Sequence, residues 1–135
     1  MFKHILFPTD GSDLSKNAAR CVVSFAKKTG AQITVFYALE DKFGTLTEEL
    51  EEQICDALDS VEECCKEVEV SCKKLTLTSD SPYEGILKAS EQSDCDLIFM
   101  ASHGHKGFKK LLLGSVTQDV LTHSKTPVLV YRSPQ

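Results

Sequence analysis

Short apolar runs alternate along this 135-residue chain with longer stretches in which apolar side chains recur every three or four positions. The short runs predict strands, because they are rich in β-branched and aromatic residues or alternate apolar with polar positions. Five such runs occur, at residues 5–7, 33–39, 73–78, 96–101 and 128–131. The run at 96–101 is continuously apolar after its first residue, which is typical of a central strand, whereas KKLTLT at 73–78 is typical of an edge strand.

The stretches with helical spacing predict four helices. Ser12 or Asp13 can cap the first, which we expect to end at Gly30. The second begins near Thr47 and runs for about twenty residues with one apolar stripe and one acidic face.

Two capping-box patterns predict the starts of the remaining helices. Residues 81–84, SPYE, combine a capping serine, a proline at the first helical position and a returning acid, and this helix runs to about Ser93. Residues 115–118, SVTQ, have a similar form, so we expect Ser115 to open the last helix.

Strict alternation of strand and helix predicts an α/β fold with an open five-stranded parallel sheet and helices on both faces. A chain of this length is the size of one domain, so we expect residues 1–135 to form a single domain. Ligands of such folds bind beyond the carboxyl ends of the strands. Two polar segments follow strand ends, PTDGS at 8–12 and ASHGHKGFKKLLLGSVTQ at 101–118.

The charge distribution favours a small anionic ligand over a nucleic acid. The net charge is −5, and 12 of the 20 acidic residues lie between positions 40 and 69. From position 101 onward there are five Lys or Arg and a single acid, Asp119. An acidic protein with a locally positive C-terminal third suits a small-anion site and not a nucleic-acid or membrane surface. No apolar run approaches the length of a membrane span, so we expect a cytoplasmic protein.

Six cysteines are present without a CxxC pair. We interpret them as reduced, mostly buried small hydrophobes. The alternative is a redox protein that uses Cys64, Cys65 and Cys72. Cys72 is expected near the third strand and not on the preceding helix.

The segment at 101–118 has the features of a phosphate seat. Gly104 and Gly114 permit positive φ and close backbone approach, Ser115 and Thr117 offer hydroxyls, and the N–H groups at a helix start favour anions. The competing interpretation is an ordinary helix cap beside a solvated basic loop. Neither GxxxxGK[ST] nor GxGxxG occurs, which argues against a P-loop NTPase and a standard dinucleotide-binding domain.

The chain resembles the universal stress proteins over essentially its full length. The family pattern Gly-x2-Gly-x9-Gly-(Ser/Thr) matches residues 101–115, with Ala101 in place of the first glycine. ILFPTDGS, DLIFMASHG, LLLGSVTQ and TPVLVYR match further blocks in the same order. The resemblance implies a Rossmann-like fold, similar to the adenine nucleotide alpha hydrolases, with strand order 3-2-1-4-5. Alanine adds one methyl group where the ligand approaches, and it needs no unusual φ if the site is strand-like.

The resemblance also implies an adenine-nucleotide site for ATP, ADP or AMP, with or without Mg²⁺. Asp10 would lie near the ribose, Ala38 at the adenine edge, and Gly104 with residues 114–117 around the phosphates. The implied binding residues are Pro8, Thr9, Asp10, Ala38, Met100, Ala101, His103, Gly104, Gly114, Ser115, Val116 and Thr117.

By the same resemblance, the protein acts in stress response or signalling as a homodimer. The partner copy would pair with the last strand, which comprises Val128, Leu129, Val130 and Tyr131. We expect ATP hydrolysis to be weak at most. His103 and His105 are the candidates for a general base, and we interpret them as loop residues that face solvent. The alternative is a dimeric interaction module that binds no nucleotide, for which Ala101 is the main argument. A phospho-acceptor receiver using Asp10 and Lys125 is disfavoured, because that lysine precedes the last strand and would lie at the wrong end of the sheet.

Overall fold

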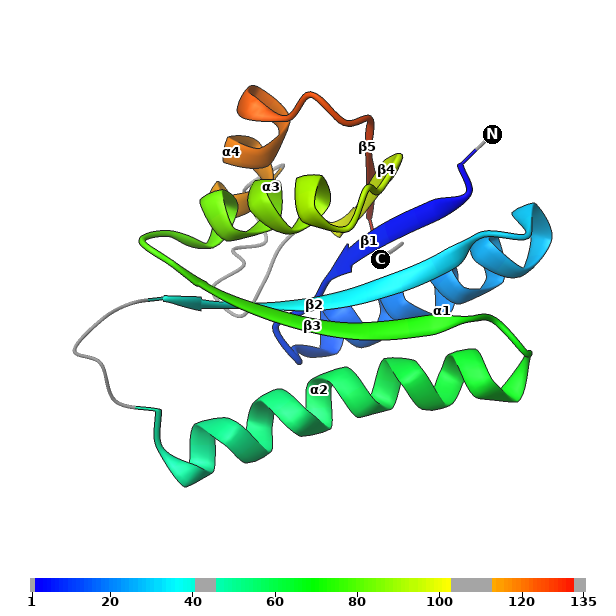
Figure 1. The fold of residues 1–135 in the computed structure, drawn as a ribbon, viewed down its shortest axis with the longest axis horizontal. Helices are drawn as coiled ribbons and strands as arrows, with labels where there is room; N and C mark the ends of the chain where they lie inside the picture. Colours follow the sequence, from blue (N-terminus) through cyan, green and yellow to red (C-terminus); the bar gives the residue numbers. More distant parts are fainter. Residues whose placement is uncertain (1, 41–45, 103–112, 133–135) are drawn as a thin grey trace.

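The computed structural model describes residues 2–40, 46–102 and 113–132, and the five predicted strands form one parallel sheet within them. Its order is β3-β2-β1-β4-β5, as implied by the family resemblance (Figure 1). The strands are β1 (His4–Pro8), β2 (Gln32–Glu40), β3 (Cys72–Ser79), β4 (Leu97–Ala101) and β5 (Val128–Tyr131).

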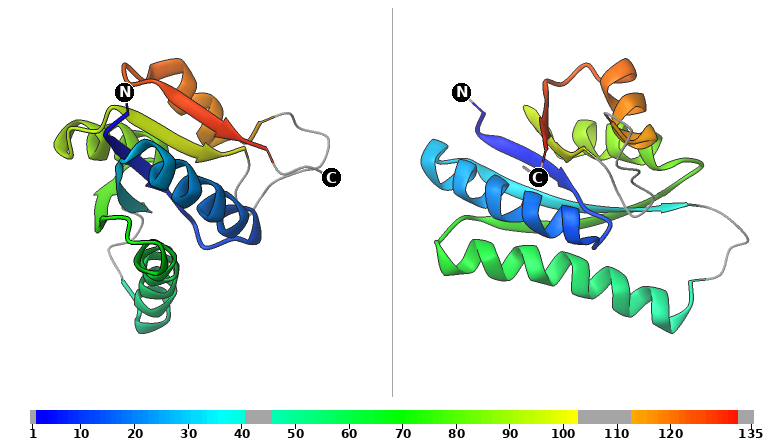
Figure 2. Two further views of the ribbon diagram at one scale, coloured as in Figure 1. Left: turned by 90° about the vertical axis from the view of Figure 1, so that its right-hand side faces the viewer. Right: turned by 180° about the vertical axis from the view of Figure 1, so that it is seen from behind.

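Helices cover both faces of the sheet, as predicted (Figures 1 and 2). Helices α1 (Asp13–Thr29) and α2 (Glu48–Glu67) lie on one face, and α3 (Pro82–Gln92) and α4 (Ser115–His123) lie on the other. Successive strand residues point to opposite faces, so Ile5 and Phe7 pack against α1 while Leu6 joins the core under α3 and α4. All five residues of β4 are buried, which confirms its central position. Within the described parts of the chain, no helix is both long and apolar enough to cross a bilayer.

The pairing of β1 with β4 is firm at the amino ends of the strands and absent at their carboxyl ends. Asp96 accepts hydrogen bonds from the backbone N–H groups of Lys3 at 2.8 Å and His4 at 3.1 Å, and its own N–H donates to the His4 carbonyl at 2.9 Å. Ladder pairing then covers only Ile5–Leu97 and Leu6–Ile98, whereas β1 pairs with β2 over five positions. The two strands therefore separate toward the edge where a ligand is expected.

The first two helices begin as predicted. Ser12 caps α1 by accepting a hydrogen bond from the Ser15 N–H, and Gly30 ends it in the left-handed conformation with φ 74°. Thr47 caps α2 in the same way, through the Leu50 N–H. These caps satisfy backbone donors that have no acceptor inside the helix.

Both predicted capping boxes are wrong, for different reasons. Ser81 occupies the N-cap position of α3 and Pro82 follows it, but the serine side chain makes no cap hydrogen bond and its buried Oγ has no partner. In α4 the N-cap residue is Gly114, so Ser115 is already helical. The Gln118 side chain donates to the Leu113 carbonyl at 3.2 Å instead of returning to the N-cap N–H.

Gly85 in the first turn of α3 allows the helix to approach β2 and β3 closely. A Cβ at this position would lie 2.7 Å from Ser79 Oγ and 3.6 Å from the Phe36 ring. We expect Gly85→Ala to lower the free energy of unfolding by about 1–3 kcal/mol despite the higher helix propensity of alanine, because the contact is overpacked. Urea unfolding of the variant measures the change.

Ser79→Ala supplies the matched background, because it removes the atom that the new methyl group would meet. In that background Gly85→Ala should cost less than it does in the wild type. A Gly85→Ala variant as stable as the wild type would contradict the close packing of this turn.

Candidate functional site

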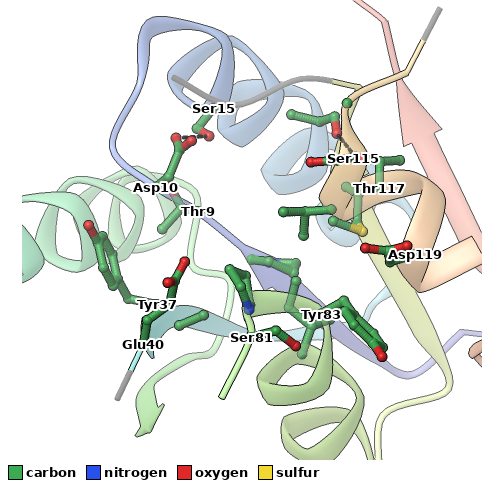
Figure 3. Close-up of a pocket in the computed structure, with 18 residues that line it drawn as sticks. Thr9, Asp10, Ser15, Tyr37, Glu40, Ser81, Tyr83, Ser115, Thr117 and Asp119 are labelled. Atoms are coloured by element: carbon green, nitrogen blue, oxygen red, sulfur yellow. Dashed lines mark hydrogen bonds between the residues drawn. The ribbon is translucent and has the colours of Figure 1, made fainter. Parts of the chain in front are cut away.

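A cavity of about 520 Å³ opens at the carboxyl ends of β1, β2 and β4, beside the starts of α3 and α4 (Figure 3). Its volume is in the range of small-molecule sites. It lies where the connections from β1 and β4 lead to opposite sides of the sheet, which is the usual ligand position in open α/β folds.

The sequence-predicted site residues that the structure describes all line this cavity. They are Pro8, Thr9, Asp10, Ala38, Met100, Ala101, Gly114, Ser115, Val116 and Thr117. His103 and Gly104, the other two predicted residues, lie outside the described residues. The structure therefore brings together three chain segments that are far apart in the sequence.

The turn after β1 holds Asp10 in a defined position on the cavity wall. Its Oδ1 accepts hydrogen bonds from the Ser12 N–H at 2.9 Å and from Ser15 Oγ at 2.8 Å (Figure 3). Gly11 turns the chain with φ 79°, and its N–H donates to Thr9 Oγ1 at 3.2 Å. Two donors on one oxygen fix the orientation of the carboxylate.

Tyr37 and Glu40, at the end of β2, lie on the same side of the cavity as Asp10 (Figure 3). Burial, together with the negative charge of Asp10, raises the pKa of the Tyr37 hydroxyl. Two carboxylates therefore occupy this side, and carboxylate oxygens accept hydrogen bonds from hydroxyl donors.

The start of α4 forms the opposite side of the cavity and has the properties of an anion seat. The N–H groups of Ser115, Val116 and Thr117 have no acceptor inside the helix and lie at the positive end of its dipole. The Gly114 N–H is engaged with the Ser102 carbonyl at 2.7 Å. The first turn thus presents three backbone donors on this side, and such donors at a helix start favour anions.

Two details of this seat differ from the expectation. Gly114 has φ −71° and ψ 161°, so an extended backbone, and not a positive φ, places it at the cavity. Thr117 Oγ1 donates to the Ala101 carbonyl at 3.0 Å, so the hydroxyl ties α4 to β4. The Ser115 side chain is exposed, as a ligand-facing hydroxyl requires.

Ala101, the departure from the family pattern, is accommodated without backbone strain. It is the last residue of β4 and pairs with Tyr131 in ordinary strand geometry. The residue lines the cavity and also belongs to the core cluster under α1 and α2, and 9% of it remains exposed. The alanine therefore leaves the strand conformation unchanged.

Part of the cavity wall was not predicted. The additional lining residues are Ser15, Tyr37, Glu40, Ser81, Pro82, Tyr83, Ile86 and Asp119. Ser81 follows the carboxyl end of β3. The expectation that ligands bind beyond the carboxyl ends of strands could therefore have identified it. Ser81 lines the cavity and its buried Oγ has no partner, and the nearby Tyr83 ring stacks on His123 at a centroid distance of 5.1 Å.

The comparisons with known proteins agree with this geometry. The model of the universal stress protein family matches residues 1–132. The chain belongs to the universal stress protein family. A universal stress protein of Methanocaldococcus jannaschii, MJ0577, is 31% identical over 98% of this chain and 96% of its own length. A solved structure of MJ0577 gives a TM-score of 0.88 at 28% identity and covers 100% of this chain and 99% of that one.

More distant universal stress protein structures share the fold. One, in complex with cAMP, has a TM-score of 0.79 at 20% identity over 98% of this chain and 99% of that one. Another, from Archaeoglobus fulgidus in complex with dAMP, has a TM-score of 0.75 at 17% identity over 96% and 97% of the two chains. Adenine nucleotides are therefore bound by other proteins of this fold and family.

The effect of the Asp10 charge on Tyr37 predicts a pH dependence. A raised Tyr37 pKa means that the folded state holds this proton more tightly than the unfolded chain does. This proton therefore contributes to the free energy of unfolding at pH values below the ordinary tyrosine pKa. The contribution is lost as pH rises through the pKa of Tyr37 in the folded state. Asp10→Asn should lower the Tyr37 pKa, because it removes the neighbouring negative charge, and absorbance titration of tyrosinate measures it.

Tyr37→Phe assigns the titration step, because the chain has three tyrosines. An unchanged Tyr37 step in Asp10→Asn would show that the two side chains do not interact as described.

Proposed function

We propose that this universal stress protein binds an adenine nucleotide, with ATP as the first candidate and ADP or AMP as related ones, in the cavity at the carboxyl edge of the sheet. The proposal rests on two unlike groups that face each other across one cavity. An anion seat of backbone N–H groups lies on one side, and an oriented carboxylate, Asp10, lies on the other. A nucleotide has complementary groups, because its phosphates are anionic and its ribose hydroxyls donate hydrogen bonds.

The charge pattern favours one orientation of the ligand. Phosphate groups would lie at residues 115–117, where the helix start attracts negative charge. The ribose would lie between the separated ends of β1 and β4, where Asp10 accepts hydrogen bonds from its hydroxyls. The adenine would then reach Ala38 on β2 and the start of α3.

Ser81 supports placement of the base near α3. A buried hydroxyl without a partner is uncommon in a folded protein and often marks a position completed by a ligand. Ser81 can donate to a ring nitrogen or accept from an amino group. The apolar side chains of Ile86 and Met100 line the cavity as well and would pack against the base.

Magnesium would enter with the phosphates and not through a dedicated protein site. In residues 2–40, 46–102 and 113–132, no group of three or more His, Cys, Asp or Glu side chains is arranged to hold a metal ion. Mg²⁺ commonly binds substrate phosphates with few protein ligands. We expect hydrolysis to be weak at most, because the anion seat consists of backbone donors and hydroxyls that bind phosphate without activating water.

The exposed edge of the sheet supports self-association as a second part of the proposal. β5 is the outermost strand on its side, and its four apolar and aromatic residues are all half-buried. An apolar edge strand with unpaired backbone groups is a surface that proteins commonly cover. A second copy would pair with it in a symmetric dimer.

A universal stress protein fold that acts only as an interaction module is the alternative, because Ala101 places a methyl group on the cavity wall. Titration calorimetry of the wild type with ATP and Mg²⁺ distinguishes the two. No binding at millimolar nucleotide would favour the interaction module.

Gly114→Val tests the location of the phosphate seat. The extended backbone at Gly114 accommodates a β-branched residue, so the fold should persist, but the new side chain would enter the cavity. We expect ATP affinity to fall at least tenfold, which corresponds to about 1.4 kcal/mol. Calorimetry measures the affinity, and circular dichroism verifies the fold.

Thr122→Val is the matched control, because Thr122 is an exposed residue of α4 whose hydroxyl bonds only to the preceding turn. Its affinity should equal that of the wild type. Undiminished binding by Gly114→Val would place the phosphates elsewhere.

A further inference from the structure

Two cysteines from neighbouring elements meet at the end of the sheet opposite the cavity. Cys65 lies in the last turn of α2, and Cys72 is the first residue of β3, as the sequence predicted for that cysteine. The connection between them is a tight turn (Figure 1). The Cys65 carbonyl accepts hydrogen bonds from the N–H groups of Val68 at 3.3 Å and Val70 at 2.8 Å, and Glu69 adopts φ 60°.

This turn brings the two side chains into one part of the core. Cys65 is buried in the packing between α2 and the sheet, and Cys72 packs against the same cluster, with its Sγ donating to the Lys73 carbonyl at 3.8 Å. The adjacent Cys64 packs against this cluster as well.

The two thiols differ in access and in acidity. Cys65 is fully buried, whereas Cys72 is half-buried on an edge strand. The interaction with the Cys65 side chain lowers the pKa of the Cys72 thiol, against the opposing effects of burial and of the Glu62 charge. The same interaction and burial raise the pKa of Cys65. Cys72 is therefore the more acidic and the more accessible of the two thiols.

We propose that Cys65 and Cys72 form a redox-active dithiol that a hydroperoxide converts into an intrachain disulfide. The Cys72 thiolate attacks one peroxide oxygen, the O–O bond breaks, and Cys72 becomes a sulfenic acid while the other oxygen leaves as hydroxide or alkoxide. The Cys65 sulfur then attacks the Cys72 sulfur and displaces the hydroxyl group, which leaves as water with the Cys65 proton. Two thiols lose two electrons in total, and the peroxide gains them.

The position of the pair separates this chemistry from the ligand site. Cys72 begins β3 and Ser79 ends it, so the pair lies roughly 23 Å along the strand from the cavity edge, at about 3.3 Å per residue. The disulfide would join the end of α2 to the edge strand. The proposal therefore stands independently of nucleotide binding.

Oxidation of the wild-type protein with hydrogen peroxide tests the proposal directly. The number of thiols that can be alkylated in denaturant should fall from six to four, the intact mass should decrease by two hydrogens, and dithiothreitol should reverse both changes. Peptide mapping should find Cys65 linked to Cys72.

Cys72→Ser and Cys64→Ser form a matched pair of variants that leaves the buried Cys65 in place. Cys72→Ser should keep its five thiols, because the reactive member is gone. Cys64→Ser should still lose two. In Cys65→Ser, the Cys72 sulfenic acid should persist and react with dimedone, because no resolving thiol is present.

Three results would overturn the proposal. The first is retention of all six thiols in the wild type after peroxide treatment. The second is formation of a disulfide in Cys72→Ser after the same treatment. The third is a covalent dimer through the exposed Cys55 as the main product on a non-reducing gel.

Discussion

The short ladder between β1 and β4 determines where the cavity of this protein lies. Asp96 holds the amino ends of the two strands together through the N–H groups of Lys3 and His4. Pairing between them ends after Leu6 and Ile98, and beyond that point β1 continues beside β2 and β4 continues beside β5. Residues of four other elements, α1, β2, α3 and α4, line the space that results. A longer ladder would close the cavity, and a missing one would leave the two halves of the sheet unconnected.

The polar groups around this gap are held by hydrogen bonds within the protein, one set on each side of the cavity. Asp10 is oriented by Ser12 and Ser15 a few residues later, and Thr117 attaches α4 to the carbonyl of Ala101. These hydrogen bonds orient the groups on each side of the cavity, and the sheet sets the distance between the two sides. The methyl group of Ala101 is accommodated because it changes none of these hydrogen bonds.

Much of the fold could be predicted because its periodicities are unambiguous. The continuous apolar run in β4 and the single apolar stripe of α2 each allow one structural interpretation, and the alternation of the two element types implies a parallel sheet. The cavity residues predicted from the family resemblance follow strand ends or the start of α4. Predictions failed where side chains choose among several partners, as at Ser81 and Gln118, whose capping roles depend on the backbone geometry of the turn. The Cys65–Cys72 contact was also beyond sequence reasoning, because it depends on the tight turn at Glu69.

The most direct test of the central claim is an amide NMR titration of the ¹⁵N-labelled protein with ATP. The account predicts saturable shifts at Ser115, Val116 and Thr117 and at Ala38 on β2, on the two sides of one cavity. Lys73, at the far end of β3, should keep its position and serves as the internal reference. Shifts at the phosphate end alone would contradict adenine binding at β2, and an unchanged spectrum at millimolar ATP would contradict the nucleotide site altogether.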